Sequence, residues 1–92
     1  MRYLVFLDAG HGLDTPGKRT PLFEDGSFMR ENEFNRYVVR KIDSLLEKYE
    51  NIDVYFVSPE KRDVMLEQRV NRVNEIYERY QDIYQKSVLI SI

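Results

Sequence analysis

The stretch Tyr3-Leu4-Val5-Phe6-Leu7-Asp8-Ala9-Gly10-His11-Gly12 decides the fold. Its first five residues are apolar, and they are followed by an acidic residue and by two glycines around a histidine. A continuous apolar run of this length is typical of a strand that is buried on both faces, as in a parallel sheet. We therefore predict a central strand over Tyr3–Leu7. His11, the only histidine of the chain, is expected just beyond its carboxyl end.

Two amphipathic helices are predicted further along the chain, over residues 31–49 and 66–80, because apolar residues recur there every three or four positions. The expected apolar faces consist of Phe34, Val38, Ile42, Leu45 and Tyr49 in the first helix, and of Leu66, Val70, Val73, Tyr77 and Tyr80 in the second. Asp25 or Ser27 is expected to cap the first helix. Arg69 and Asn74 are expected on a solvent-exposed polar face of the second helix.

Two further strands are predicted, over Ile52–Val57 and Ser87–Ile92, since both segments are rich in β-branched residues. The resulting order is strand, helix, strand, helix, strand. This alternation indicates an α/β fold with a mostly parallel sheet and flanking helices.

Composition and charge exclude several classes of function. The net charge is −2 with acids and bases interspersed, so no basic surface for nucleic acid is expected. The chain has no cysteine, which excludes disulfides and thiolate metal sites. The apolar run at the N-terminus is too short for the hydrophobic part of a signal peptide or for a membrane span. We therefore expect no signal peptide and no membrane partner.

The candidate site lies where the predicted strands end. In an open α/β sheet, ligands bind outside the carboxyl ends of the strands, so Asp8, His11 and the long loop over residues 13–28 converge on one edge. Glu31 follows that loop, at the start of the first helix. An imidazole and a carboxylate suit zinc, but each also has an ordinary explanation: a loop histidine bonded to a carbonyl, and an acid favoured by the helix dipole. Two ligands are one short of a catalytic zinc site.

A competing interpretation comes from Gly12–Arg19, which nearly matches the phosphate-binding loop G-x-x-x-x-G-K-[ST]. Arg19 stands where the hydroxyl that binds magnesium belongs. Pro16 removes a loop N–H, and Pro21 blocks a helix directly after the loop. Nucleotide binding is therefore not favoured. Lys18 and Arg19 are interpreted as a solvated pair or as contacts for an anionic substrate.

Taken together, these segments resemble the catalytic domain of zinc-dependent N-acetylmuramoyl-L-alanine amidases of the amidase-3 type, especially endolysin-like members. Val5–Gly12 is similar to the opening motif of that family, Thr15–Pro21 to a loop of its lytic subgroup, and Arg30–Asn35 to its helix start. Leu66–Asn74 matches a helix pattern of leucine, arginine and asparagine. Ser87–Ile92 resembles the strand that leads into the second zinc-binding histidine.

The resemblance implies a metal site and a reaction. It makes His11 the first zinc ligand, and it selects Glu31 over Glu33 because the ligating glutamate of the family precedes an asparagine by four positions, here Asn35. In the family, zinc polarises the amide carbonyl and activates a water, while a catalytic glutamate handles protons. The bond that is cut joins N-acetylmuramic acid to L-alanine of the stem peptide. The implied partner is peptidoglycan, and the implied place of action is the bacterial cell wall.

The sequence departs from the family pattern after Ile92, where the second zinc histidine would be the next residue. The catalytic glutamate of the family has no counterpart either. We therefore expect residues 1–92 to be the N-terminal part of a larger amidase domain, truncated before the second histidine, with an incomplete zinc site and no catalytic residue of its own. The isolated chain is expected to be inactive or to need a complementary C-terminal fragment, and that fragment or a second copy of the chain (a homo-oligomer) is the expected protein partner. The alternative is a non-catalytic remnant or interaction module that assembles through its exposed terminal strand.

Overall fold

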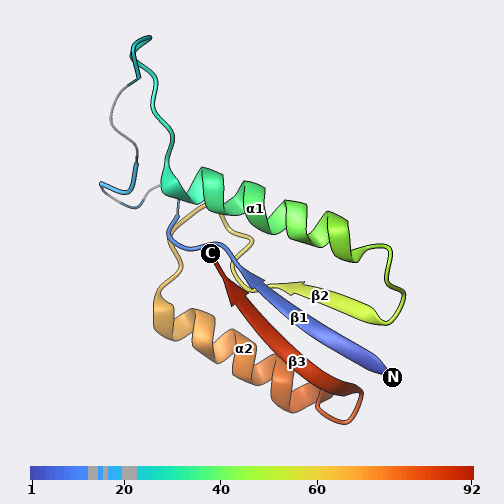
Figure 1. The fold of residues 1–92 in the computed structure, drawn as a ribbon. Helices are drawn as coiled ribbons and strands as arrows, with labels where there is room; N and C mark the ends of the chain where they lie inside the picture. Colours follow the sequence, from blue (N-terminus) through green and yellow to red (C-terminus); the bar gives the residue numbers. More distant parts are fainter. Residues whose placement is uncertain (13–14, 16, 20–22) are drawn as a thin grey trace.

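A three-stranded parallel sheet forms the centre of the molecule (Figure 1). In this computed structural model, which describes residues 1–12, 15, 17–19 and 23–92, β1 (Arg2–Asp8) lies between β2 (Ile52–Phe56) and β3 (Tyr84–Ser91). Val5 of β1 is in register with Val54 on one side and Val88 on the other. The predicted α/β fold with parallel strands is confirmed.

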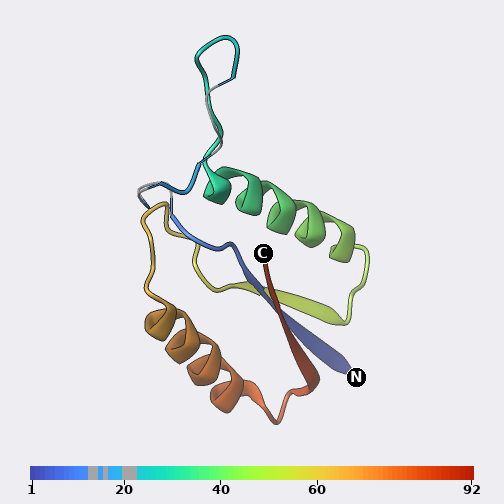
Figure 2. The same cartoon turned by 60° about the vertical axis from the view of Figure 1, so that its left-hand side comes forward.

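The two helices cover opposite faces of the sheet (Figure 2). Leu4 and Phe6 point toward α2 (Leu66–Tyr80), and Leu7 and Ala9 point toward α1 (Glu31–Leu46). This alternation follows from the pleat of a strand, which turns successive side chains to opposite faces. β1 is therefore buried from both sides, as its apolar sequence predicts, and its carboxyl end is held in a fixed place between the helices.

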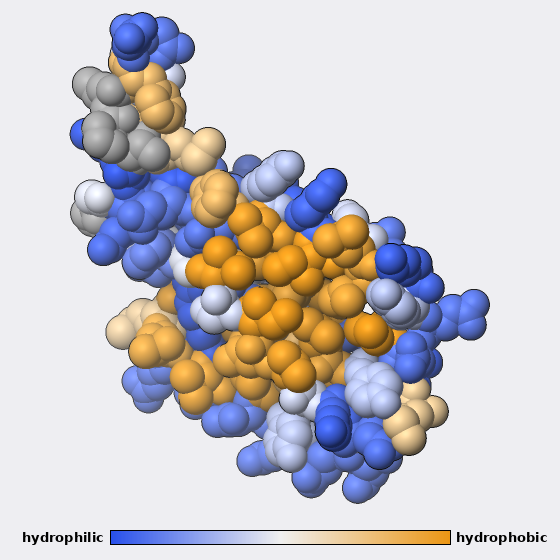
Figure 3. All heavy atoms as spheres, viewed as in Figure 1, coloured by the Kyte–Doolittle hydropathy of each residue, from blue (hydrophilic) through white to orange (hydrophobic). Residues whose placement is uncertain are grey.

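The apolar faces of the helices are wider than the sheet that they cover. Phe34 and Leu45 of α1 and Leu66 and Val70 of α2 are exposed, although all four belong to the predicted apolar faces. Among the described residues the sheet has three strands, so part of each helix face has no strand opposite it. Figure 3 shows the result, a continuous hydrophobic surface between the two helices.

The start of α1 differs from the prediction. Asp25 and Ser27 do not cap the helix; the backbone N–H and the hydroxyl of Ser27 both donate to a carboxylate oxygen of Asp25, at 2.9 and 2.6 Å. Residue 30 precedes the helix without a side-chain cap, and the N–H of Glu31 donates to the carbonyl of Lys18 at 2.9 Å. Residues 23–29 form an arm that extends away from the sheet (Figure 1). Glu31, at the base of this arm, is held by its hydrogen bond to Lys18.

No helix in the described part of the chain combines the length and the apolar character needed to cross a membrane.

Candidate metal centre

His11 and Glu31 meet at the carboxyl end of β1. His11 follows the strand, Glu31 is the first residue of α1, and the distance between His11 Nε2 and Glu31 Oε2 is 3.3 Å. Their side chains are 37% and 51% exposed, so the pair is open to solvent on one side. Glu33 is directed elsewhere, because its carboxylate lies 3.7 Å from the guanidinium of Arg30.

The spacing of this pair suits two ligands of one metal ion. An imidazole nitrogen and a carboxylate oxygen are both zinc donors, and two ligands of a tetrahedral zinc at the usual bond lengths are about 3.3 Å apart. The distance of 3.3 Å between His11 Nε2 and Glu31 Oε2 fits that edge. Among the residues that the structure describes, no group of three or more histidine, cysteine, aspartate or glutamate side chains is placed to hold a metal. The pair by itself is thus one side chain short of the three protein ligands of a catalytic zinc.

The backbone of His11 adopts a left-handed conformation, with φ of 61°. For an L-residue this conformation is unfavourable, and it is more common at functional sites than elsewhere. The glycines on either side serve a different purpose. A Cβ on Gly10 would lie 2.8 Å from the carbonyl oxygen of Ile92, and a Cβ on Gly12 would lie 2.1 Å from the backbone nitrogen of Asp63. The left-handed conformation therefore belongs to His11 itself, whereas Gly10 and Gly12 allow the backbones of Ile92 and Asp63 to come close.

Arg69 is buried beneath His11, so the prediction that it lies on a solvent-exposed face is wrong. Only 6% of Arg69 is exposed, and its guanidinium donates to the carbonyls of Val64 at 2.7 Å, Ala9 at 2.7 Å and His11 at 3.0 Å. It also donates to a carboxylate oxygen of Asp8 at 2.6 Å. The planar fork of donors in arginine suits several acceptors at once, which explains its burial at the end of a sheet where carbonyls converge.

Asp8 is committed to the same network. Besides the bond from Arg69, its carboxylate accepts hydrogen bonds from the hydroxyls of Ser58 at 2.9 Å and Ser91 at 3.0 Å. A carboxylate with these partners is the counter-charge of the buried guanidinium. Asp8 thus lies at the predicted edge of the sheet, but its contacts are structural.

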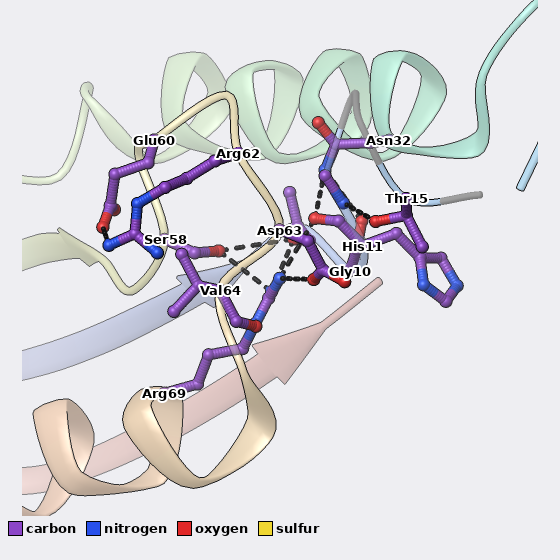
Figure 4. A network of polar contacts seen from close by, with 12 residues as sticks. Gly10, His11, Thr15, Asn32, Ser58, Glu60, Arg62, Asp63, Val64 and Arg69 are labelled. Atoms are coloured by element: carbon purple, nitrogen blue, oxygen red, sulfur yellow. Dashed lines mark hydrogen bonds and ion pairs between the residues drawn. The ribbon is translucent and has the colours of Figure 1, made fainter.

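Asn32 completes the network from the other side, and no role was predicted for it from the sequence. It is fully buried, and its Nδ2 donates to the carbonyls of Gly10 and His11, both at 2.8 Å (Figure 4). Its Oδ1 accepts a hydrogen bond from Arg36 at 2.6 Å. The spacing of Asn32 and Arg36, one helical turn apart, is the signal that could have indicated a polar side of α1 facing the sheet.

The stretch Gly12–Arg19, which resembles a phosphate-binding loop in sequence, is followed by different structure. Residues 13, 14, 16 and 21, on which part of the comparison with such loops rests, lie outside the described residues. The first helix that the structure describes after Arg19 is α1, which begins at Glu31. The guanidinium of Arg19 lies 4.8 Å from the ring centre of Phe28, and that of Arg30 lies 5.1 Å from it. In the described part of the chain, Lys18 and Arg19 thus lie well before the N-terminus of a helix, whereas a phosphate-binding loop leads directly into one.

The fold and the paired side chains place the protein among parallel α/β domains with a candidate metal site at the carboxyl edge of the sheet. More narrowly, the chain belongs to the N-acetylmuramoyl-L-alanine amidase family, because the amidase-3 family model matches residues 5–92. The resemblance drawn from the sequence is thereby confirmed, and the chain is of the peptidoglycan amidase type. No curated protein and no solved structure matches it.

Proposed function

We propose that this chain provides part of a zinc site for cleavage of the amide bond between N-acetylmuramic acid and L-alanine of the stem peptide. His11 and Glu31 are the zinc ligands in this proposal. The observation that carries it is the 3.3 Å separation of His11 Nε2 and Glu31 Oε2, in a chain of the amidase family. Zinc bound there would polarise the amide carbonyl and lower the pKa of a bound water.

The residues of the chain have separate roles in this proposal. His11 binds through Nε2 as a neutral imidazole, and Glu31 binds as a carboxylate at the N-terminus of α1, where the helix dipole favours its charge. The exposed side of the pair leaves space for a further ligand and for substrate. A catalytic zinc has three protein ligands, so we propose that the third ligand and the proton-transferring glutamate come from polypeptide other than residues 1–92. The isolated chain is then inactive.

Calorimetric titration with zinc tests the ligand pair. The wild-type chain is expected to bind one zinc ion, and His11→Ala and Glu31→Gln are each expected to abolish that binding. Glu33→Gln is the matched control, because this neighbouring carboxylate lies beside Arg30 and should leave zinc affinity unchanged. Zinc binding that survives His11→Ala would refute the site. An assay with muropeptide then measures activity with and without a complementary C-terminal fragment.

A second candidate function, assembly through β3, is favoured by the hydrophobic surface. β3 is an edge strand of the sheet, and Val88 and Leu89, which point to opposite faces, are 54% and 53% exposed. Leu66 and Val70 line a hollow beside Leu89. Exposed strand edges and apolar patches of this kind are typical of protein–protein contacts. We propose that a complementary amidase fragment binds here, with homo-oligomers as the competing assembly.

Mass measurement in solution tests this assembly. The wild-type chain is expected to form a stable complex with the complementary fragment, and Val88→Lys is expected to prevent it by placing a charge in the contact. Tyr37→Lys is the control that should leave the complex intact, because Tyr37 is also exposed but lies in α1 rather than in β3. A wild-type chain that stays monomeric alone and in the presence of the fragment would exclude assembly through β3.

A further inference from the structure

We infer that Asn32 and Arg69 are positioning residues for His11: they hold its backbone in the left-handed conformation that directs the imidazole toward Glu31. Figure 4 shows the ring of His11 pointing away from both side chains, while its backbone lies between them. The consequence for metal binding rests on the proposed zinc function. The conformational part of the inference does not, because it concerns the backbone of the metal-free chain.

The carbonyls of three consecutive residues receive these donors. Arg69 donates to Ala9 at 2.7 Å and to His11 at 3.0 Å. Asn32 donates to Gly10 and to His11, both at 2.8 Å. The His11 carbonyl is thus bound from α1 and from α2 at the same time. A rotation of His11 to a right-handed conformation would turn this carbonyl away from both donors. The two hydrogen bonds therefore oppose the intrinsic preference of an L-residue for the right-handed conformation.

Both donors are themselves fixed. Asn32 is fully buried, and its Oδ1 accepts the bond from Arg36 at 2.6 Å. Arg69 is 6% exposed and is bound to Asp8 at 2.6 Å and to Ser58 at 3.0 Å. Side chains locked in this way can define the position of a neighbouring ligand closely, as the outer partners of metal ligands do.

Arg72 is a matched control for Arg69, since it lies on the same helix and also forms an ion pair. Its guanidinium donates to Glu60 at 2.8 Å and to the carbonyl of Val57 at 2.8 Å, away from His11. Replacement of arginine by lysine keeps the charge but removes the fork of donors. Arg69→Lys and Arg72→Lys therefore differ in whether the His11 carbonyl loses a donor.

The first test uses NMR on the full chain without metal. Backbone carbon shifts and the coupling constant of the His11 amide report whether φ is positive. Wild type and Arg72→Lys are expected to give a left-handed His11, whereas Arg69→Lys and Asn32→Ala are expected to give a right-handed or averaged one. A left-handed signature that persists in Arg69→Lys and Asn32→Ala would overturn the inference. Should Arg69→Lys not fold, Asn32→Ala decides, because alanine is favourable in a helix.

The second test measures zinc affinity under conditions where circular dichroism shows each variant to be fully folded. Arg69→Lys and Asn32→Ala are expected to weaken zinc binding by about 10–100-fold, the effect usual for outer partners of a metal ligand. Arg72→Lys is expected to bind as wild type does. Unchanged affinity in Arg69→Lys and Asn32→Ala would overturn the role in metal binding. If the His11→Ala variant binds zinc as tightly as wild type does, the proposed zinc function fails. The NMR result alone then decides whether Asn32 and Arg69 position the backbone of His11.

Discussion

Replacing His11 by glycine should give a more stable protein than replacing it by alanine. Both substitutions delete the imidazole and its contact with Glu31, so their difference isolates the backbone at φ of 61°. Alanine in the left-handed region costs about 1–2 kcal/mol. Glycine avoids this cost but loses about 0.5–1 kcal/mol more conformational entropy on folding. With the middle of each range, the net advantage of glycine at position 11 is about 0.75 kcal/mol.

Thermal and urea denaturation of the two variants measure this difference. The glycine variant should melt about 2–8 °C higher than the alanine variant, given the usual relation between free energy and melting temperature in a domain of this size. Position 33 provides a control of opposite sign. Glu33 lies in the first turn of α1, where glycine should be less stable than alanine by about 1 kcal/mol. An alanine variant at position 11 as stable as the glycine variant would refute a left-handed, strained His11.

Two other predictions follow from the ion pairs. Asp8→Ala should lower the free energy of unfolding by about 3–5 kcal/mol, because it removes the buried counter-charge of Arg69 and leaves only the more exposed carboxylate of Asp63, 3.6 Å away. Urea unfolding measures this, and a loss below about 1 kcal/mol would contradict it. The hydrogen bonds from Arg72 lower the pKa of Glu60 from 4.5 to about 2. Since the folded state has the lower pKa, the stability gained from this pair is complete above pH 4.5 and is lost as the pH falls toward 2. The stability advantage of wild type over Glu60→Gln should therefore shrink between pH 5 and pH 2 in a denaturation series, and an advantage that grows on acidification would refute the assigned pair.

The sequence predicted the structure best where a regular apolar pattern runs the whole length of one strand or helix. The apolar run of β1 predicted a strand buried on both faces, and α2 begins and ends where its pattern predicts, over Leu66–Tyr80. The limits of β3 were less evident. It begins at Tyr84 rather than at residue 87, because Gln85 and Lys86 are exposed in an edge strand and give no apolar signal.

The candidate site shows a similar division. His11 and Glu31 were found from motifs, because both occupy the ends of strongly predicted elements. Asn32 and Arg69 fall within motifs of the family, but their roles were not predicted, because most of their partners are backbone carbonyls, which are the same in every residue. A buried arginine is also uncommon, so a polar position on a helix is ordinarily interpreted as solvent-exposed. Only the tertiary structure shows that Asn32 and Arg69, near the N-terminal ends of the two helices, face the end of β1.

The partners of Asp8 have a consequence for the order of folding. Ser58, Arg69 and Ser91, which bind its carboxylate, lie 50, 61 and 83 positions further along the chain. Contacts between residues so distant in sequence form slowly, since a long loop must close before each is gained. His11 precedes these partners in the chain, so the network beneath it forms only after residue 91 has been synthesised. The hydrogen bonds that hold the His11 backbone are therefore expected to form late in folding.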